Sequence, residues 1–521
     1  MILKTMYLML FTSLWLGVVS VSAMAVEISS ASKACLGCHR MVSPGLVADW
    51  ERSRHSRTTP EGAWSAAPLE RRISARDFPA ETARSAVGCA ECHTLNPEDH
   101  KDTFDHNGFR IHLVVTPNDC STCHGVERSQ YRDNLMSKAH SNLADNGLFH
   151  DLEKTALATP LFEDGKIRLQ DANRQTEGDS CYFCHGTRVE RQGSEVRKTL
   201  FGEMTFPTLI GWPNVGVGRI NPDGSEGSCS SCHARHSFAI EMARKPATCS
   251  ECHKGPDVPA YKVYQVSKHG NIYETFKQDW NWDAVPWQVG RDFTAPTCAE
   301  CHASLVVSPQ GEVLAERTHR FNDRLSWRIF GLIYAHPHPI SADTTGIRNP
   351  EGLPLPVGLK GEVSEKYLIS EKEQSIRRER MQKVCSGCHG NSWIAGHFQR
   401  LENSIAETNA KTLTATEILL HAWELGLAEG PAQQGSPFDE WLEKLWVEQW
   451  LFYANSTRFA SAMAGADYGS FANGRWFLNR NIMEMHNHVE RLKADRGNLP
   501  GQETAVTDQT RQQSADRKDA K

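Results

Sequence analysis

The feature that most constrains this chain is a C-x-x-C-H motif that occurs eight times. Each copy places two cysteines three positions apart and a histidine directly after the second. This is the attachment pattern of a c-type haem, in which the thiols bind the porphyrin and the histidine binds the iron. The eight copies are Cys35/Cys38/His39, Cys89/Cys92/His93, Cys120/Cys123/His124, Cys181/Cys184/His185, Cys229/Cys232/His233, Cys249/Cys252/His253, Cys298/Cys301/His302 and Cys385/Cys388/His389.

The cysteine count favours haem over the other uses of a C-x-x-C pair. The chain has 521 residues and 16 cysteines, so the eight motifs account for every cysteine. A disulfide framework would not place a histidine after every second cysteine, and a zinc site would join C-x-x-C pairs in twos. We therefore predict eight covalently bound haems c, each with its motif histidine as one axial ligand.

The composition suggests that the cofactors form much of the core. Apolar residues make up 39% of the chain and aromatic residues 8%, which is modest for this length. Eight porphyrins would supply the missing apolar surface, at roughly 65 residues per haem. We expect the haem-free chain not to fold, because the cofactor binds the native state only.

The N-terminus has the order of a secretory signal peptide. Lys4 precedes an apolar stretch over residues 6–21, and Ala23-Met24-Ala25 offers small residues for cleavage. We predict cleavage after Ala25 and a periplasmic location. The alternative is an uncleaved anchor, because the apolar stretch is nearly long enough to span a bilayer. We expect no membrane span after cleavage.

The pattern between the motifs predicts a mainly α fold with little regular strand. These segments are rich in glycine, proline, asparagine and aspartate and show little period-2 alternation, so short helices joined by turns are expected. Seven motifs fall in a haem-rich region over residues 26–360. Residues 361–500 are predicted to form a bundle of long helices that carries the eighth haem, and the polar residues 501–521 to be disordered.

Apolar residues at helical spacing place three helices within that bundle. They follow a charged, proline-free segment over residues 364–410. The predicted helices cover residues 414–429, 439–464 and 476–495.

The charge of the chain bears on its partners. The formal net charge is −6, and the haem propionates would add to it. Nothing in the sequence suggests nucleic-acid binding. A soluble c-type cytochrome with a basic patch is the electron partner that we expect.

Histidines beyond the motifs are candidates for the second axial position. The chain has 23 histidines, so 15 remain. A haem that only carries electrons usually has two axial ligands, whereas a catalytic haem leaves one position open. The predicted distal ligands are His55, His112, His140, His236, His269 and His319, with His336 and His397 competing for a seventh place. We place His55 and His140 on helices. We expect structural or solvent-facing roles for His100, His106, His150, His421, His486 and His488.

Several segments together resemble one family. They are VTPNDCSTCH, CYFCHGT, CHARHSF, CHKGPD followed by SKHG, APTCAECH, and HRFNDRLSWRIFGLIYAHP followed by GLPLPV. Over residues 30–490 the chain resembles the octahaem hydroxylamine oxidoreductase family. The resemblance implies a mostly helical homotrimer with a connected haem array, in which the fourth haem is five-coordinate and catalytic.

The resemblance also assigns individual residues. His185 matches the proximal ligand of the catalytic haem, Asp257 a distal-pocket acid and Tyr334 a distal-pocket tyrosine. Tyr468 lies where oxidising members have a tyrosine crosslinked to the fourth haem of a neighbouring subunit. One departure is Val258, because family members commonly read Asp-His-Pro at this point. An apolar side chain cannot move a proton, so a base expected for oxidation to nitrite is missing.

Three functions are compatible with these residues. The leading hypothesis is a dehydrogenase that oxidises hydroxylamine, or a related nitrogen compound such as hydrazine, and passes electrons through the other seven haems. The second is a nitrite or hydroxylamine reductase of the same fold, the direction expected without the crosslink. The third is a non-catalytic electron conduit with all eight irons saturated, a hypothesis to which Val258 gives weight.

Overall fold

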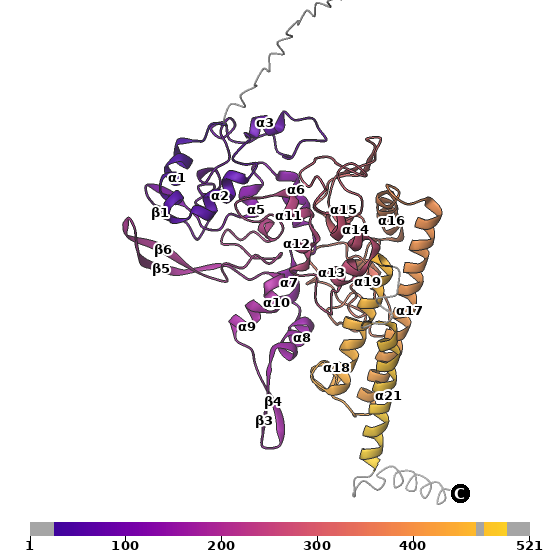
Figure 1. Cartoon of the computed structure of the whole chain (residues 1–521). Coiled ribbons are helices and arrows are strands. Elements are labelled where there is room, and N and C mark those ends of the chain that lie inside the picture. Colours follow the sequence, from indigo (N-terminus) through magenta and orange to yellow (C-terminus); the bar gives the residue numbers. More distant parts are fainter. Residues whose placement is uncertain (1–25, 465–471, 473, 498–521) are drawn as a thin grey trace, which may run out of the picture.

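The structure is a computed structural model that describes residues 26–464, 472 and 474–497. The predicted signal peptide, the predicted tail from residue 501 and Tyr468 lie outside these residues. The chain is mainly helical with only small sheets, which confirms the predicted fold class. Figure 1 shows a body of short helices and loops, flanked on one side by long C-terminal helices.

Short helices carry the motifs because one helical turn suits haem attachment. Residues i, i+3 and i+4 share one face of a helix, so two thiols and an imidazole point the same way. The helices of the body are α1 (Ser30–Val42), α2 (Pro44–Arg52), α3 (Pro60–Trp64), α4 (Ala90–His93), α5 (Pro117–Cys120), α6 (Gly125–Arg132), α7 (Ala139–Ala144), α8 (Gly147–Leu157), α9 (Arg174–Asp179), α10 (Cys181–His185), η1 (Cys229–Ser231), α11 (Ile240–Arg244), α12 (Pro246–Ser250), α13 (Ala260–Val266), α14 (Lys268–Phe276), α15 (Cys298–His302) and η2 (Glu365–Tyr367).

The strands form hairpins and one small three-stranded sheet. The antiparallel pairs are β1–β2 (Phe104–His106, Phe109–Ile111), β3–β4 (Thr159–Glu163, Lys166–Gln170), β5–β6 (Glu190–Thr199, Gly202–Ile210) and β10–β11 (Trp327–Arg328, His336–Pro337), and the sheet joins β7 (Trp287–Gln288), β8 (Val306–Val307) and β9 (Val313–Ala315). The β5–β6 hairpin projects from the body (Figure 1). Most of β5 is exposed. A strand without a buried face needs no alternation of apolar and polar residues, so no sequence pattern predicted it.

The C-terminal region consists of long helices, as expected. They are α16 (Glu371–Cys385), α17 (Asn391–Glu424), η3 (Pro431–Gln433), α18 (Trp441–Val447), the π-helical segment η4 (Glu448–Ala454), α19 (Asn455–Met463) and α21 (Arg475–Gly497). The end of the charged segment and the first predicted helix form one continuous helix, α17. The domain boundary near residue 361 stays a prediction.

Buried tryptophans tie these helices together. The Trp446 indole donates a hydrogen bond to Thr416 Oγ1 at 2.9 Å, and the Trp423 indole donates to Glu443 Oε1 at 3.0 Å. Aromatic side chains of this size dominate core energetics, and the buried N–H groups have acceptors. Among the described residues, no helix combines the length and the apolar character needed to cross a bilayer.

Candidate haem array and fourth-haem site

A continuous cavity runs through the body of the protein. Its volume is about 2290 Å³, and cysteines or histidines from the second to the eighth motif line it. None of the 16 cysteines is in a disulfide. Thiols and imidazoles that converge on one large interior space fit covalently bound porphyrins, which would supply electron transfer when bound.

Backbone carbonyls orient three of the motif histidines. The Nδ1 atoms of His93, His185 and His302 lie 2.8, 3.1 and 3.1 Å from the carbonyl oxygens of His112, Ala139 and Phe321. An Nδ1–H that donates to a carbonyl leaves Nε2 free as the metal ligand. Burial also lowers the pKa of His185, although the Ala139 carbonyl and Asp257 oppose this effect. The ring is therefore neutral, as a ligand must be.

Four motif histidines face another histidine at the spacing of a shared iron. Two imidazoles on opposite sides of one ion, with metal–nitrogen bonds of about 2.0–2.1 Å, place their ring centroids about 6.3 Å apart. The observed centroid distances are 6.2 Å for His39 and His106, 6.4 Å for His55 and His124, 6.5 Å for His93 and His236, and 6.1 Å for His269 and His389. Four distal positions thus have candidate ligands.

The structure differs from two expectations about these histidines. His106 was expected to be structural, but its ring centroid lies at an iron-sized distance from that of His39, so it is a candidate ligand. Its position in the β1–β2 hairpin depends on tertiary structure and left no local signal in the sequence. His55 was expected on a helix but lies in a turn that follows α2.

His112 and His140 lie next to motif histidines, but not on the side of the ring where Nε2 would bind the iron. The carbonyl of His112 accepts from His93 Nδ1, and the residue before His140 holds His185 in the same way. Both residues therefore approach the side of the ring opposite the metal ligand. His112 instead stacks on His100, with centroids 3.6 Å apart. His140 Nδ1 lies 2.6 Å from the Gly186 carbonyl oxygen, so its Nε2 stays available to another iron.

The remaining distal candidates differ in how close they lie to a motif histidine or to the cavity. His319 lies close to His233, whose pKa is lowered to about 4 by burial and then by His319. His397 is separated from His389 by Trp393, which stacks between the two rings. His336 is fully buried but does not line the cavity, whereas His338, which had no predicted role, does.

The fourth motif has a carboxylate beside it. Asp257 and Val258 line the cavity together with Cys184 and His185. The charge of Asp257 acts on His185 and on His253 of the sixth motif. Among the described residues, no histidine ring lies at the spacing of a shared iron from His185, and the same holds for His233, His253 and His302. The geometry therefore places Asp257 on the same cavity wall as the fourth motif.

Tyr334 does not join this group. Its side chain is buried among the C-terminal helices, and its hydroxyl donates to the Leu359 carbonyl at 2.8 Å and lies 3.2 Å from Thr416 Oγ1. It is not among the residues that line the cavity. The expectation that it hydrogen-bonds a ligand of the fourth haem was wrong for the chain as described, because its hydroxyl is already engaged elsewhere.

Two family matches cover parts of the chain. Residues 34–125 match the family described as cytochrome c554 and c-prime, and residues 221–322 match the family of seven times multi-haem cytochrome CxxCH. The chain is also 25% identical over 420 residues to a probable nitrite reductase–hydroxylamine oxidoreductase fusion protein from Kuenenia stuttgartiensis. That alignment covers 78% of this chain but only 39% of the relative.

Two solved structures are similar along most of the chain. A hypothetical multiheme protein has a TM-score of 0.85 at 42% identity, covering 91% of this chain and 98% of that one. A reducing hydroxylamine oxidoreductase (HAO)-like protein complex from Kuenenia stuttgartiensis has a TM-score of 0.59 at 17% identity, covering 90% and 86%. The chain therefore belongs to the multihaem c-type cytochromes. Its fold is similar to that of the reducing HAO-like protein complex.

The His39–His106 pair allows a direct test. Replacing His106 by glycine is expected to convert one haem from a low-spin, six-coordinate state to a high-spin state, because the second axial ligand is lost. Electron paramagnetic resonance of the oxidised protein measures this change. The matched control is His150→Gly, since that exposed histidine contacts Glu153 and faces no motif histidine. An unchanged spectrum in His106→Gly would remove His106 from the ligand set.

The cavity leads to a prediction about folding. When haem attachment is prevented, the chain is expected to show no cooperative thermal unfolding transition, because an apolar interior of about 2290 Å³ would be left unfilled. Circular dichroism of protein made with and without haem maturation checks this. A cooperative transition in the haem-free chain would contradict a cofactor-built core.

Proposed function

We propose that the protein is an octahaem oxidoreductase that oxidises hydroxylamine, or a related small nitrogen compound such as hydrazine, at the fourth motif. The observation that carries the proposal is the position of Asp257, a carboxylate on the cavity wall beside His185. The fusion relative, whose name includes hydroxylamine oxidoreductase, supports the substrate class. Electrons would leave through the other seven haems to a soluble cytochrome. The proposal also places the protein in the periplasm.

Asp257 has the chemistry that the reaction needs. Oxidation of hydroxylamine to nitrite consumes one water and releases five protons and four electrons. A carboxylate beside the substrate can accept protons as they are released. The backbone of Asp257 is fixed by the side-chain amide of Asn455 in α19, which donates to its carbonyl at 3.0 Å. Asp257 is thus a positioned acid–base group.

The second candidate function is reduction of nitrite or hydroxylamine at the same place. Val258 weighs against oxidation, because it offers no imidazole to take up the protons that oxidation releases. The name of the fusion relative also includes nitrite reductase. The homotrimer and the Tyr468 crosslink belong to the oxidising proposal, since a crosslink would alter the macrocycle and favour electron withdrawal.

One set of assays on the purified holoprotein tests the proposal. Hydroxylamine or hydrazine is supplied with oxidised cytochrome c, and nitrite or hydroxylamine with a reduced viologen. Oxidation faster than reduction, with a crosslinked trimer on a denaturing gel, is the expected result. Faster reduction and a monomer on the gel would establish the second candidate. If neither oxidation nor reduction is observed and the spectrum has no high-spin ferric signal, the result would support a non-catalytic electron conduit.

A further inference from the structure

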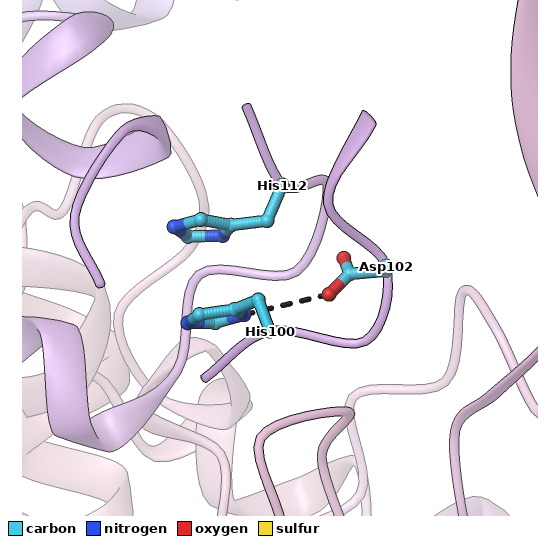
Figure 2. Close-up of side chains that lie close together, drawn as sticks. All are labelled: His100, Asp102 and His112. Atoms are coloured by element: carbon cyan, nitrogen blue, oxygen red, sulfur yellow. Dashed lines mark ion pairs between the residues drawn. The ribbon is translucent and has the colours of Figure 1, made fainter. Parts of the chain in front are cut away.

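A buried cluster of His100, Asp102 and His112 lies beside the second motif (Figure 2). Their exposed fractions are 4%, 0% and 0%. One ligand atom from each residue lies within 4.8 Å of the others. The cluster lies on the side of His93 away from its metal-ligand nitrogen, so it is separate from the haem that His93 would bind.

Polar atoms inside this cluster lack hydrogen-bond partners. They are Nδ1 of His100, Oδ1 of Asp102 and both ring nitrogens of His112. A buried polar atom without a partner is costly, and such atoms in a native protein call for an explanation. One such atom from each of the three residues lies close enough to the others to share a single partner that accepts electron pairs.

The spacing of two of these atoms fits a metal ion. His100 Nδ1 and Asp102 Oδ1 are 3.4 Å apart, the distance of an ion pair when His100 is protonated (Figure 2), but they do not form a hydrogen bond. Two ligands at about 2.0–2.1 Å from one tetrahedral ion are separated by about 3.4 Å. The separation is therefore long for a hydrogen bond and natural for two ligands of one cation.

The surroundings complete the pattern of a metal site. A histidine that binds a metal almost always donates its other N–H to a carboxylate or carbonyl, and ligating carboxylates are themselves hydrogen-bonded. His100 Nε2 lies 3.3 Å from the Asp119 carboxylate. Asp102 Oδ2 accepts from the backbone N–H groups of Leu113 and Val114, at 2.9 Å each. These contacts leave His100 Nδ1 and Asp102 Oδ1 free.

Charge balance also favours a divalent cation. Asp102 and Asp119 are both buried, and two buried negative charges need compensation. One divalent ion with two neutral histidines would balance them. A single proton on His100 would leave one negative charge in the interior.

We propose that His100, Asp102 and His112 bind a divalent transition-metal ion, with zinc as the expected occupant. Two imidazoles and one carboxylate form a donor set that zinc accepts, and non-haem iron is the other occupant that the same donors suit. His112 now stacks on His100 with an angle of 11° between the rings, so it would turn its ring to become the third ligand. The burial of all three side chains makes the site structural.

The ion would support the second haem indirectly. Asp102 holds the backbone of Leu113 and Val114, and the neighbouring His112 carbonyl accepts from His93 Nδ1. His100, Asp102 and His112 are thus positioning residues for His93. This inference does not depend on the reaction at the fourth motif.

Elemental analysis of the purified holoprotein tests the proposal, with haem counted separately. After passage over a chelating resin, we expect about one zinc per chain and no iron beyond that in haem. One extra iron in place of zinc would also support the site, with iron as occupant. Less than a tenth of an equivalent of any divalent transition metal, even after growth with added zinc, would overturn it.

Variants and diffraction locate the metal. His100→Gln and Asp102→Asn are each expected to lose it, whereas the controls His150→Gln and Asp99→Asn keep it. Retention in both His100→Gln and Asp102→Asn would overturn the assignment. Should these variants fail to fold, anomalous diffraction from the wild-type protein at the zinc edge decides: a peak among the three side chains supports the site, and a peak only elsewhere refutes it.

Discussion

Replacing Cys181 and Cys184 together by serine is expected to remove one haem and lower turnover by at least about 10³-fold. Both thioether bonds of the fourth haem would be lost, and His185 alone would not retain the porphyrin. Because the cofactor carries the chemistry, no side chain could replace it, and enzymes commonly exceed the uncatalysed rate by about 10⁶-fold or more. Intact-mass analysis measures the haem content, and the assays described above measure turnover.

The matched control is the same change in the first motif, Cys35→Ser with Cys38→Ser. Its residues do not line the central cavity, whereas Cys184 and His185 of the fourth motif do. We expect loss of one haem with most of the turnover retained. If both double variants lose turnover equally, the effect reflects a broken electron path or a damaged fold, and the fourth motif would no longer be singled out.

The sequence predicted best where chemistry dictates spacing. A haem c needs two thiols and an imidazole on one face, and one helical turn supplies this. The motif therefore revealed both the cofactor and the local structure, as in α10 (Cys181–His185). The long C-terminal helices were also predictable, because apolar residues such as Leu419 and Trp423 recur at helical spacing.

The second axial ligands were harder to predict, because tertiary structure selects them. His112 and His106 are close in sequence, and each ring lies at an iron-sized centroid distance from a motif histidine, 6.0 Å for His112 and His93 and 6.2 Å for His106 and His39. The carbonyl of His112, however, accepts from His93 Nδ1, so His112 lies on the side of His93 away from the metal-ligand nitrogen. The sequence shows how many ligands are needed but not which ring faces which motif.

Residues assigned to the fourth motif by family resemblance also depend on tertiary structure. Asp257 reaches the cavity because it lies in the short loop between the sixth motif and α13 (Ala260–Val266). Tyr334 was assigned to the same pocket, but the packing of α17 and the Leu359 carbonyl hold its hydroxyl in the helical core. Asp257 therefore lines the same cavity as the fourth motif, whereas Tyr334 does not.

Asp257→Asn is expected to lower turnover by about 10²–10⁴-fold while leaving the haem content unchanged, since general acid–base groups contribute on this scale. The amide keeps the size of the side chain, and the backbone carbonyl of residue 257 would still accept from Asn455. The fold should therefore survive, and thermal unfolding checks this.

The pH dependence separates a direct role of Asp257 from a structural one. Protons accepted by a carboxylate produce an acid limb in the pH–rate profile, and an amide cannot titrate, so that limb should disappear in Asp257→Asn. Asp171→Asn, a change at an exposed aspartate near α8, is the matched control and should alter neither rate nor profile. If Asp257→Asn keeps wild-type turnover and its acid limb, Asp257 takes no part in proton transfer. Another group on the cavity wall would then have to act as the base, because the neighbouring residue, Val258, cannot accept a proton.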